Sequence, residues 1–200
     1  MKGKMLAMAA ALLCMVTVIG GTAAYHTYPD VAHNVITTEG VDIELRETML
    51  EKGPGGASRE VPFPGRIENV MPHSSASKIV RVENKTGTDA WLRARLIITV
   101  TGKDGQQLPL DEGDVQLVTP AGADELWEKE PGSEWYYYTK PLAGDAVTEP
   151  LLREVAFAPQ MGNAYQESTV TVRVEAEAVQ LANNGTTVYE ARPWVDENIV

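Results

Sequence analysis

Cysteine and histidine are almost absent from this 200-residue chain, which contains one Cys and three His. The single cysteine, Cys14, has no partner for an intramolecular disulfide, so the fold must rely on an ordinary hydrophobic core. His26, His33 and His73 form no H-E-x-x-H pair, whose spacing would set two zinc ligands on one helix face. A G-x-S-x-G elbow and a phosphate-binding glycine loop are missing too. We therefore expect no catalytic residues, metal or cofactor.

Positive charge is also scarce. The chain has 17 Lys and Arg against 28 Asp and Glu, which gives a formal net charge of −11. An acidic surface disfavours nucleic acid and anionic lipid, because both carry negative charge themselves. We therefore expect no nucleic-acid partner, and the length suits one domain with a sizeable core.

The one long apolar run lies at the N-terminus. Lys2 and Lys4 precede an uncharged stretch of 15 residues, Met5–Ile19, and small residues follow at Gly20–Ala24. A spanning helix needs about 20 apolar residues, whereas a basic start, a shorter apolar core and a small-residue exit are typical of a secretory signal. The sequence therefore predicts a signal helix over residues 1–24 and a secreted protein, extracellular or at the cell surface.

Signal peptidase is expected to cleave after Ala24. Thr22 and Ala24 provide the small side chains that the enzyme accepts at the −3 and −1 positions, and Tyr25 becomes the first residue. Cleavage would leave residues 25–200 as one domain. Before cleavage, the chain is expected to contact the membrane only through the signal segment. Counting the uncharged stretch on to Tyr25 gives 21 positions, so a retained anchor is the alternative.

Alternation of apolar and polar residues recurs along residues 25–200. It is clearest in Val41–Leu45, Trp91–Val100 and Val170–Ala178, which we interpret as half-buried strands. Further strands are expected at Lys78–Val82, Val115–Val118, Trp135–Thr139 and Glu154–Phe157. Strands that each have one apolar face must pair face to face, so the sequence predicts a single all-β, antiparallel β-sandwich.

The segments between the strands are rich in turn-forming residues. Glu47–Gly65, with its glycines, prolines and charges, is predicted to be a long exposed loop. Asp124–Lys129 is expected to form at most one short helical turn. Asn84–Thr86 and Asn184–Thr186 match the N-glycosylation triplet, but we interpret both as turns.

Four aromatic residues follow one another at Trp135, Tyr136, Tyr137 and Tyr138. Alternate residues of a strand point to opposite faces, so two rings should point inward and two outward. Packing in the core and across strands is the first interpretation. A surface that binds a carbohydrate or a protein partner through the outward rings is the second.

Six segments, in this order along the chain, resemble a known family. They are the signal end Gly20–Tyr25, the opening strand Asn34–Leu45, the hairpin strands Lys78–Asn84 and Ala90–Arg95, and the late segments Trp135–Leu142 and Val174–Gln180. Together they span nearly the whole chain. On these segments the sequence resembles the TasA and camelysin group of secreted bacterial proteins, which a signal peptidase of the SipW type processes.

The resemblance implies a jelly-roll-like sandwich that is exported to the cell surface or the biofilm matrix, with the SipW-type peptidase as a partner during export. In TasA-like proteins the N-terminal segment of one subunit adds as a strand to the next, so that subunits join into fibres. The corresponding N-terminal arm is residues 25–37. Its donor-strand candidates are Tyr25, Tyr28, Val31, Val35 and Ile36.

Camelysin-like members are described as metalloendopeptidases, which is the alternative activity that the resemblance implies. Since no zinc motif occurs here, we expect a non-enzymatic structural protein of the cell surface or biofilm matrix that self-associates into fibres or joins related matrix subunits. A surface module that binds the cell wall or another carbohydrate through Trp135–Tyr138 is a further alternative.

Overall fold

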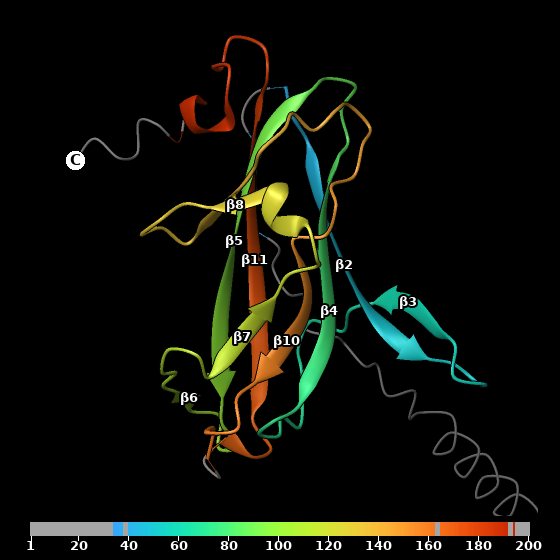
Figure 1. Cartoon of the computed structure of the whole chain (residues 1–200), viewed down its shortest axis with the longest axis vertical. Helices are drawn as coiled ribbons and strands as arrows, with labels where there is room; N and C mark the ends of the chain where they lie inside the picture. Colours follow the sequence, from blue (N-terminus) through green and yellow to red (C-terminus); the bar gives the residue numbers. More distant parts are fainter. Residues whose placement is uncertain (1–33, 38–39, 163–164, 192–193, 195–200) are drawn as a thin grey trace, which may run out of the picture. The chain divides into compact units, whose positions relative to one another are not determined.

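The protein is an all-β sandwich of two sheets (Figure 1). The computed structural model describes residues 34–37, 40–162, 165–191 and 194, with the backbone alone for residues 34–37. The predicted signal helix lies outside these residues. Within them, no helix has the length and apolar character that crossing a membrane requires. The two sheets confirm the all-β sandwich that the alternation of apolar and polar residues predicts.

The first sheet has six strands and the second has five. In order, the first contains β1 (Asn34–Thr37), β11 (Thr169–Gln180), β5 (Ala90–Thr101), β9 (Trp135–Tyr138) and β8 (Trp127–Lys129), with β6 (Gln107–Leu108) paired to β5. The second contains β3 (Ser58–Pro62), β2 (Ile43–Lys52), β4 (Ser75–Asn84), β10 (Leu152–Phe157) and β7 (Val115–Val118). The 3-10 helix η1 (Ala123–Glu125) lies between β7 and β8, and the 3-10 helix η3 (Val188–Glu190) follows β11. The connections from β4 to β5 and from β10 to β11 carry the chain from one sheet to the other, as in jelly-roll-like sandwiches.

The longest ladder joins β5 to β11 and shows why the alternating sequence folds in this way. The two strands pair without a break from Ala90 beside Gln180 to Thr101 beside Thr169. Their inward residues, such as Leu92 and Val174, are buried against the inner face of the second sheet. Burying a side chain of this size stabilises the fold by about 1.5–3 kcal/mol, so the apolar half of each strand holds the two layers together.

The pairing of β1 with β11 differs from the other ladders. Asn34–Thr37 runs parallel to Glu175–Ala178, whereas the other described strand pairs are antiparallel. The expected antiparallel sandwich therefore has one parallel strand at the edge of its first sheet.

The predicted long loop over Glu47–Gly65 is wrong. β2 continues to Lys52, turns through Gly53–Ala57 and pairs with β3 from Lys52 beside Ser58 to Thr48 beside Pro62. The end of this hairpin projects from the sandwich (Figure 1), so both of its faces meet solvent. Charged residues such as Glu51 and Arg59, whose side chains form an ion pair, replace the apolar alternation that would have revealed the strands.

The helical turn expected over Asp124–Lys129 is only partly correct. The helical part is the single turn of η1, and Trp127 then begins the edge strand β8. Trp127 leaves the helical path because its ring is buried in the main core, where its Nε1–H donates to the carbonyl of Glu149 at 3.0 Å.

Both glycosylation-like triplets lie at turns, as expected. Asn84 ends β4, and its side chain is buried. Its Nδ2 donates to the carbonyls of Thr88 and Ala143, while its Oδ1 accepts from the backbone N–H of Thr86 at 3.0 Å. The amide of Asn184 likewise donates to the carbonyl of Gln180. Both side chains therefore hold local turns together.

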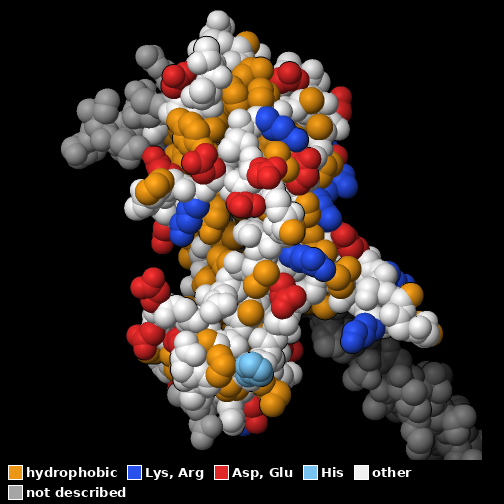
Figure 2. Space-filling model, viewed as in Figure 1, with side chains coloured by type: hydrophobic (Ala, Val, Ile, Leu, Met, Phe, Trp, Pro, Cys, Tyr) orange, Lys and Arg blue, Asp and Glu red, His pale blue; other side chains and the backbone are white. Residues whose placement is uncertain are grey.

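Paired charges cover the outer faces of both sheets. On the second sheet Arg46 pairs with Glu83 and Arg81 with Glu60. Basic and acidic side chains are interspersed over the face that Figure 2 shows. Such ion pairs are suited to a strand face that is exposed to water. They also make the folding stability depend on pH.

Stability should fall as the pH drops from about 5 to about 3. Hydrogen bonds from Arg81 and Thr48 hold the pKa of Glu60 below its usual 4.5, and a hydrogen bond from Arg46 lowers the pKa of Glu83. Since these pKa values are lower in the folded state, the unfolded chain binds more protons in acid. The stabilisation is complete above 4.5 and is lost as the pH falls through the folded pKa values. Urea unfolding, followed by tryptophan fluorescence at several pH values, measures this loss.

A double variant, Glu60→Gln with Glu83→Gln, should flatten this dependence. Glu112→Gln, at an exposed position in the loop before β7, is the matched control and should leave the slope unchanged. An equal acid slope in the double variant and in the wild type would contradict the assignment.

Candidate functional site

The predicted donor strand is described only at its C-terminal end. Val35 and Ile36 belong to β1, where Val35 pairs with Ala176 and Ile36 with Glu177 of the same chain. The residues that lie outside the described part of the chain are Tyr25, Tyr28 and Val31 of the arm, and Thr22 and Ala24 of the cleavage site.

The described residues of β1 cover part of the outer edge of β11. β1 pairs with Glu175–Ala178, and Ile67 forms an isolated antiparallel bridge with Val170. Between these two contacts, Thr171–Val174 pairs with no strand on this side among the described residues. Backbone groups on a sheet edge can accept an extended segment, because main-chain hydrogen bonds alone can hold it there.

The aromatic strand β9 divides its rings between two cores. Tyr136 and Tyr138 face the main core between the sheets, whereas Trp135 and Tyr137 point to the outer face. The predicted alternation is confirmed. The Tyr138 hydroxyl donates to the carboxylate of Glu149, and burial together with this bond raises the pKa of Tyr138.

A C-terminal segment, here named the C-terminal cover (residues 188–191 and Trp194), lies over the outward ring of Tyr137. The ring centroids of Tyr189 and Trp194 are 5.2 Å and 6.5 Å from that of Tyr137, whose side chain is 3% exposed. A second, smaller core contains the buried residues of the cover with their neighbours on the first sheet, namely Val188, Ala191, Trp194, Trp91, Tyr137 and Val179. The predicted aromatic surface is therefore narrower than four rings, since only Trp135 and Tyr136 keep partial exposure.

Arg93 lies between two tryptophan rings at the margin of this second core. Its guanidinium carbon is 4.2 Å from the ring centroid of Trp135 and 5.1 Å from that of Trp194. Its Nε and Nη2 donate to Oε2 of Glu177 at 2.7 Å and 2.6 Å. Although the side chain is only 3% exposed, stacking and the ion pair offset the cost of burying its charge.

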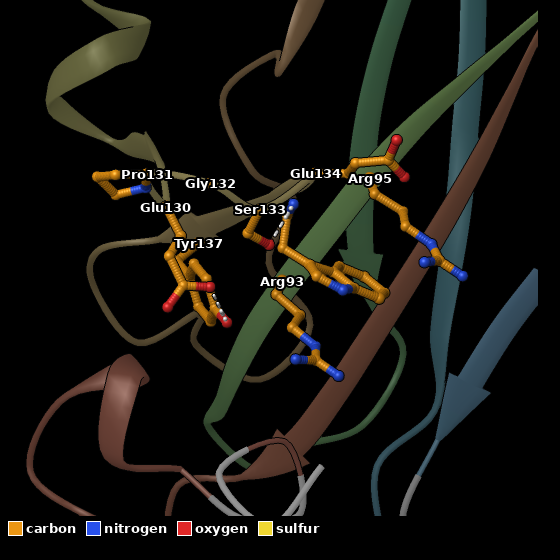
Figure 3. Close-up of a pocket in the computed structure, with 9 residues that line it drawn as sticks. Arg93, Arg95, Glu130, Pro131, Gly132, Ser133, Glu134 and Tyr137 are labelled. Atoms are coloured by element: carbon orange, nitrogen blue, oxygen red, sulfur yellow. Dashed lines mark hydrogen bonds between the residues drawn. The ribbon is translucent and has the colours of Figure 1, made fainter. Parts of the chain in front are cut away.

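A polar pocket of about 530 Å³ lies beside this arginine (Figure 3). Its wall is the loop Glu130–Glu134, which joins β8 to β9, and its floor is formed by Arg93, Arg95, Trp135 and Tyr137. The Tyr137 hydroxyl donates to Glu130 on one side of the pocket, and Arg95 extends from β5 on the other (Figure 3). The pocket therefore presents both donors and acceptors.

Metal ligands do not gather in the part of the chain that the structure describes. There, no group of three or more His, Cys, Asp or Glu side chains is placed to hold an ion. His73 lies in the turn before β4 and lines a smaller cavity of about 350 Å³ with Phe157 and Pro159. His26 and His33 lie outside the described residues.

Sequence analysis missed a buried ion pair in the second sheet. The Lys78 ammonium contacts the Glu47 carboxylate, and the two side chains are 0% and 6% exposed. The Phe63 ring lies over the ammonium, 3.9 Å from centroid to Nζ. Burial lowers the pKa of Lys78, and Glu47 opposes that shift. The available signal was the strand period, which places Lys78 on the same face as Val80 and Val82.

Among the described residues, the candidate recognition sites that we consider are the edge of β11 beside β1 and the polar pocket over β5 and β9. A scan against protein-family models, a search of curated proteins and a search of solved structures each found no match for this chain.

Proposed function

We propose that this protein is a secreted, non-enzymatic structural protein of the cell surface or biofilm matrix, whose subunits assemble by donating the N-terminal arm as a strand. The observation that carries the proposal is the edge of β11. There the four described residues of β1 pair in parallel with Glu175–Ala178, and Thr171–Val174 pairs with no described strand on that side.

The parallel pairing of β1 within its own subunit supports exchange between subunits. β1 pairs with four of the twelve residues of β11, in the parallel arrangement, which is slightly less stable per residue than the antiparallel one. An identical segment from a neighbouring subunit would form the same main-chain hydrogen bonds, because a ladder does not depend on which chain supplies the strand. Strand exchange therefore costs little once subunits meet.

The rest of the sandwich is consistent with a subunit that assembles through the edge of a sheet. Both sheets bury one face against the other and carry paired charges outside, so the body is held by its core without the arm. The expected export signal and the resemblance to TasA-like proteins also support this reading. A signal peptidase of the SipW type would release the arm at Tyr25.

Deleting residues 25–37 from the secreted protein should give a folded monomer that forms no fibres. The remaining strands, β2 to β11, keep both sheets and the core between them. Circular dichroism and urea unfolding test the fold, while light scattering and electron microscopy test assembly. The proposal would be contradicted if the deletion variant formed fibres. It would also be contradicted if the wild-type protein stayed monomeric at all concentrations.

A pair of proline variants provides a finer test. Neighbouring N–H groups of a strand point to opposite edges, so only one of Val35→Pro and Ile36→Pro removes a hydrogen bond to β11. One variant should block assembly and the other serves as its matched control. Equal assembly by both would show that the β1 ladder is not the joint between subunits.

A further inference from the structure

The polar pocket over β5 and β9 combines charged groups of both signs around one partly exposed aromatic ring. Arg95 donates its Nε to Glu175 at 2.6 Å, and 35% of its side chain remains exposed. Glu130 and Glu134 bring carboxylates to the loop wall, and Glu134 is exposed. Ligand sites of this volume, roughly 300–1,000 Å³, commonly hold small molecules.

The mixture of charges narrows the class of ligand. The two carboxylates of the loop would repel an anion, and the two arginines would repel a cation. Neither kind of ion therefore gains a clear electrostatic advantage in the pocket. An apolar molecule would bury these groups without hydrogen bonds, which is costly. A hydroxyl group both donates and accepts, so a neutral molecule rich in hydroxyls satisfies both kinds of group at once.

The lining is held in place before any ligand arrives. Trp135 lies against both guanidinium groups, 4.2 Å from Arg93 and 4.8 Å from Arg95, measured from the ring centroid. Its backbone N–H donates to the Ser133 hydroxyl at 3.1 Å, and its carbonyl accepts from the N–H of Glu130 at 3.1 Å. Since these groups are already ordered, binding would lose little conformational freedom.

We propose that this pocket binds a short neutral oligosaccharide. Trp135 lies against the apolar face of a sugar ring, the Arg95 guanidinium donates to hydroxyl oxygens, and Glu134 accepts from hydroxyl groups. The site is separate from the assembly edge, because β11 and β5 stand between β1 and β9 in the order of the sheet. Loss of fibre assembly would leave this proposal unaffected, and the reverse also holds.

Titration of the secreted protein with chitotriose, cellotriose and maltotriose, followed by tryptophan fluorescence and calorimetry, tests the proposal. At least one sugar should bind saturably with a dissociation constant in the millimolar range. Glu134→Lys should weaken that binding about tenfold or more, because it removes an acceptor and adds a third cation to the pocket. Glu112→Lys makes the same change of charge on an exposed loop outside the pocket and should bind as the wild type does.

Arg95→Gln provides a second variant, which keeps a polar side chain but removes the guanidinium, and it should also weaken sugar binding. Circular dichroism and urea unfolding check that each variant is folded. The proposal is overturned if none of the three sugars shows saturation up to its solubility limit, or if Glu134→Lys binds as tightly as Glu112→Lys. Saturable binding of triglycine with none of the sugars would assign the pocket to peptides and would also overturn it.

Discussion

Glu47→Leu should lower the free energy of unfolding by about 3–5 kcal/mol, because it leaves the Lys78 ammonium buried without its carboxylate. Lys78 has no exposed surface on which to regain water. The Phe63 ring, 3.9 Å away, keeps some attraction for the charge but cannot accept its hydrogen bonds as a carboxylate does. Urea unfolding at neutral pH measures the loss.

The double variant, Glu47→Leu with Lys78→Met, distinguishes two causes of the destabilisation. One is the unpaired buried charge of Lys78, and the other is the loss of packing. Two apolar side chains of similar volume should recover most of the stability, since replacing a buried pair by well-packed apolar groups is often neutral or stabilising. The coupling energy from the four proteins then reports the interaction between the two residues. A double variant as unstable as Glu47→Leu would place the damage in packing instead.

The pH dependence of Glu47→Leu provides an independent check. Burial lowers the pKa of Lys78, so on raising the pH the folded state loses this proton before the unfolded chain does. Between the folded pKa and the usual 10.5, the unfolded state binds more protons, and stability must rise with pH. Without Glu47, which opposes the effect of burial on the pKa of Lys78, the variant should lose this proton at a lower pH than the wild type, so its destabilisation should shrink as the pH rises toward 10.5. A purely structural defect would show no such recovery.

The residues that sequence analysis interpreted correctly share one property, which is that one face of their strand is buried. In β5 the apolar residues that alternate from Leu92 to Val100 face the core, so the two-residue period in the sequence marks the strand along this length. β3 and the end of β2 project into solvent, and Glu51 and Arg59 satisfy each other across the hairpin. With no buried face there is no apolar period, and only the pairing itself identifies these strands.

The charged clusters depend on register, which local sequence does not contain. Arg93 and Arg95 alternate with the apolar residues of β5, but their partners Glu177 and Glu175 lie about 80 residues away in the chain and meet them only through the β5–β11 ladder. The polar pocket likewise needs the loop Glu130–Glu134 to fold back over β5. Composition and period could predict the sheet, but not which carboxylates and rings would surround each arginine.

Trp194→Ala should release the C-terminal cover from the first sheet. The buried ring contacts Tyr137 and Arg93, and its Nε1–H donates to the carbonyl of Val188 at 2.8 Å. Removing a buried tryptophan side chain costs about 3–5 kcal/mol. Because the cover belongs to the smaller second core and not to the main core between the sheets, we expect this cost to appear as local opening rather than as global unfolding.

Two measurements detect that opening. Hydrogen exchange should speed up at the amides of Glu190 and Ala191, whose bonds to the carbonyls of Thr187 and Val188 close the turn of η3. Acrylamide should quench Trp91, which is buried beneath the cover in the wild type. Trp194→Phe is the control, because it keeps an aromatic ring and should show a smaller change. Unchanged exchange and quenching in Trp194→Ala would mean that the cover holds without this ring.

The same variant separates the cover from the polar pocket. Trp194 is absent from the pocket lining but contacts two residues of its floor, Arg93 and Tyr137. After the cover opens, Arg93 loses its contact with Trp194 but keeps its hydrogen bond to Glu177 and its contact with Trp135. Most of the contacts that position Arg93 in the pocket floor therefore remain. Sugar binding by Trp194→Ala should therefore weaken less than in Glu134→Lys. A complete loss would make the C-terminal cover part of the binding site.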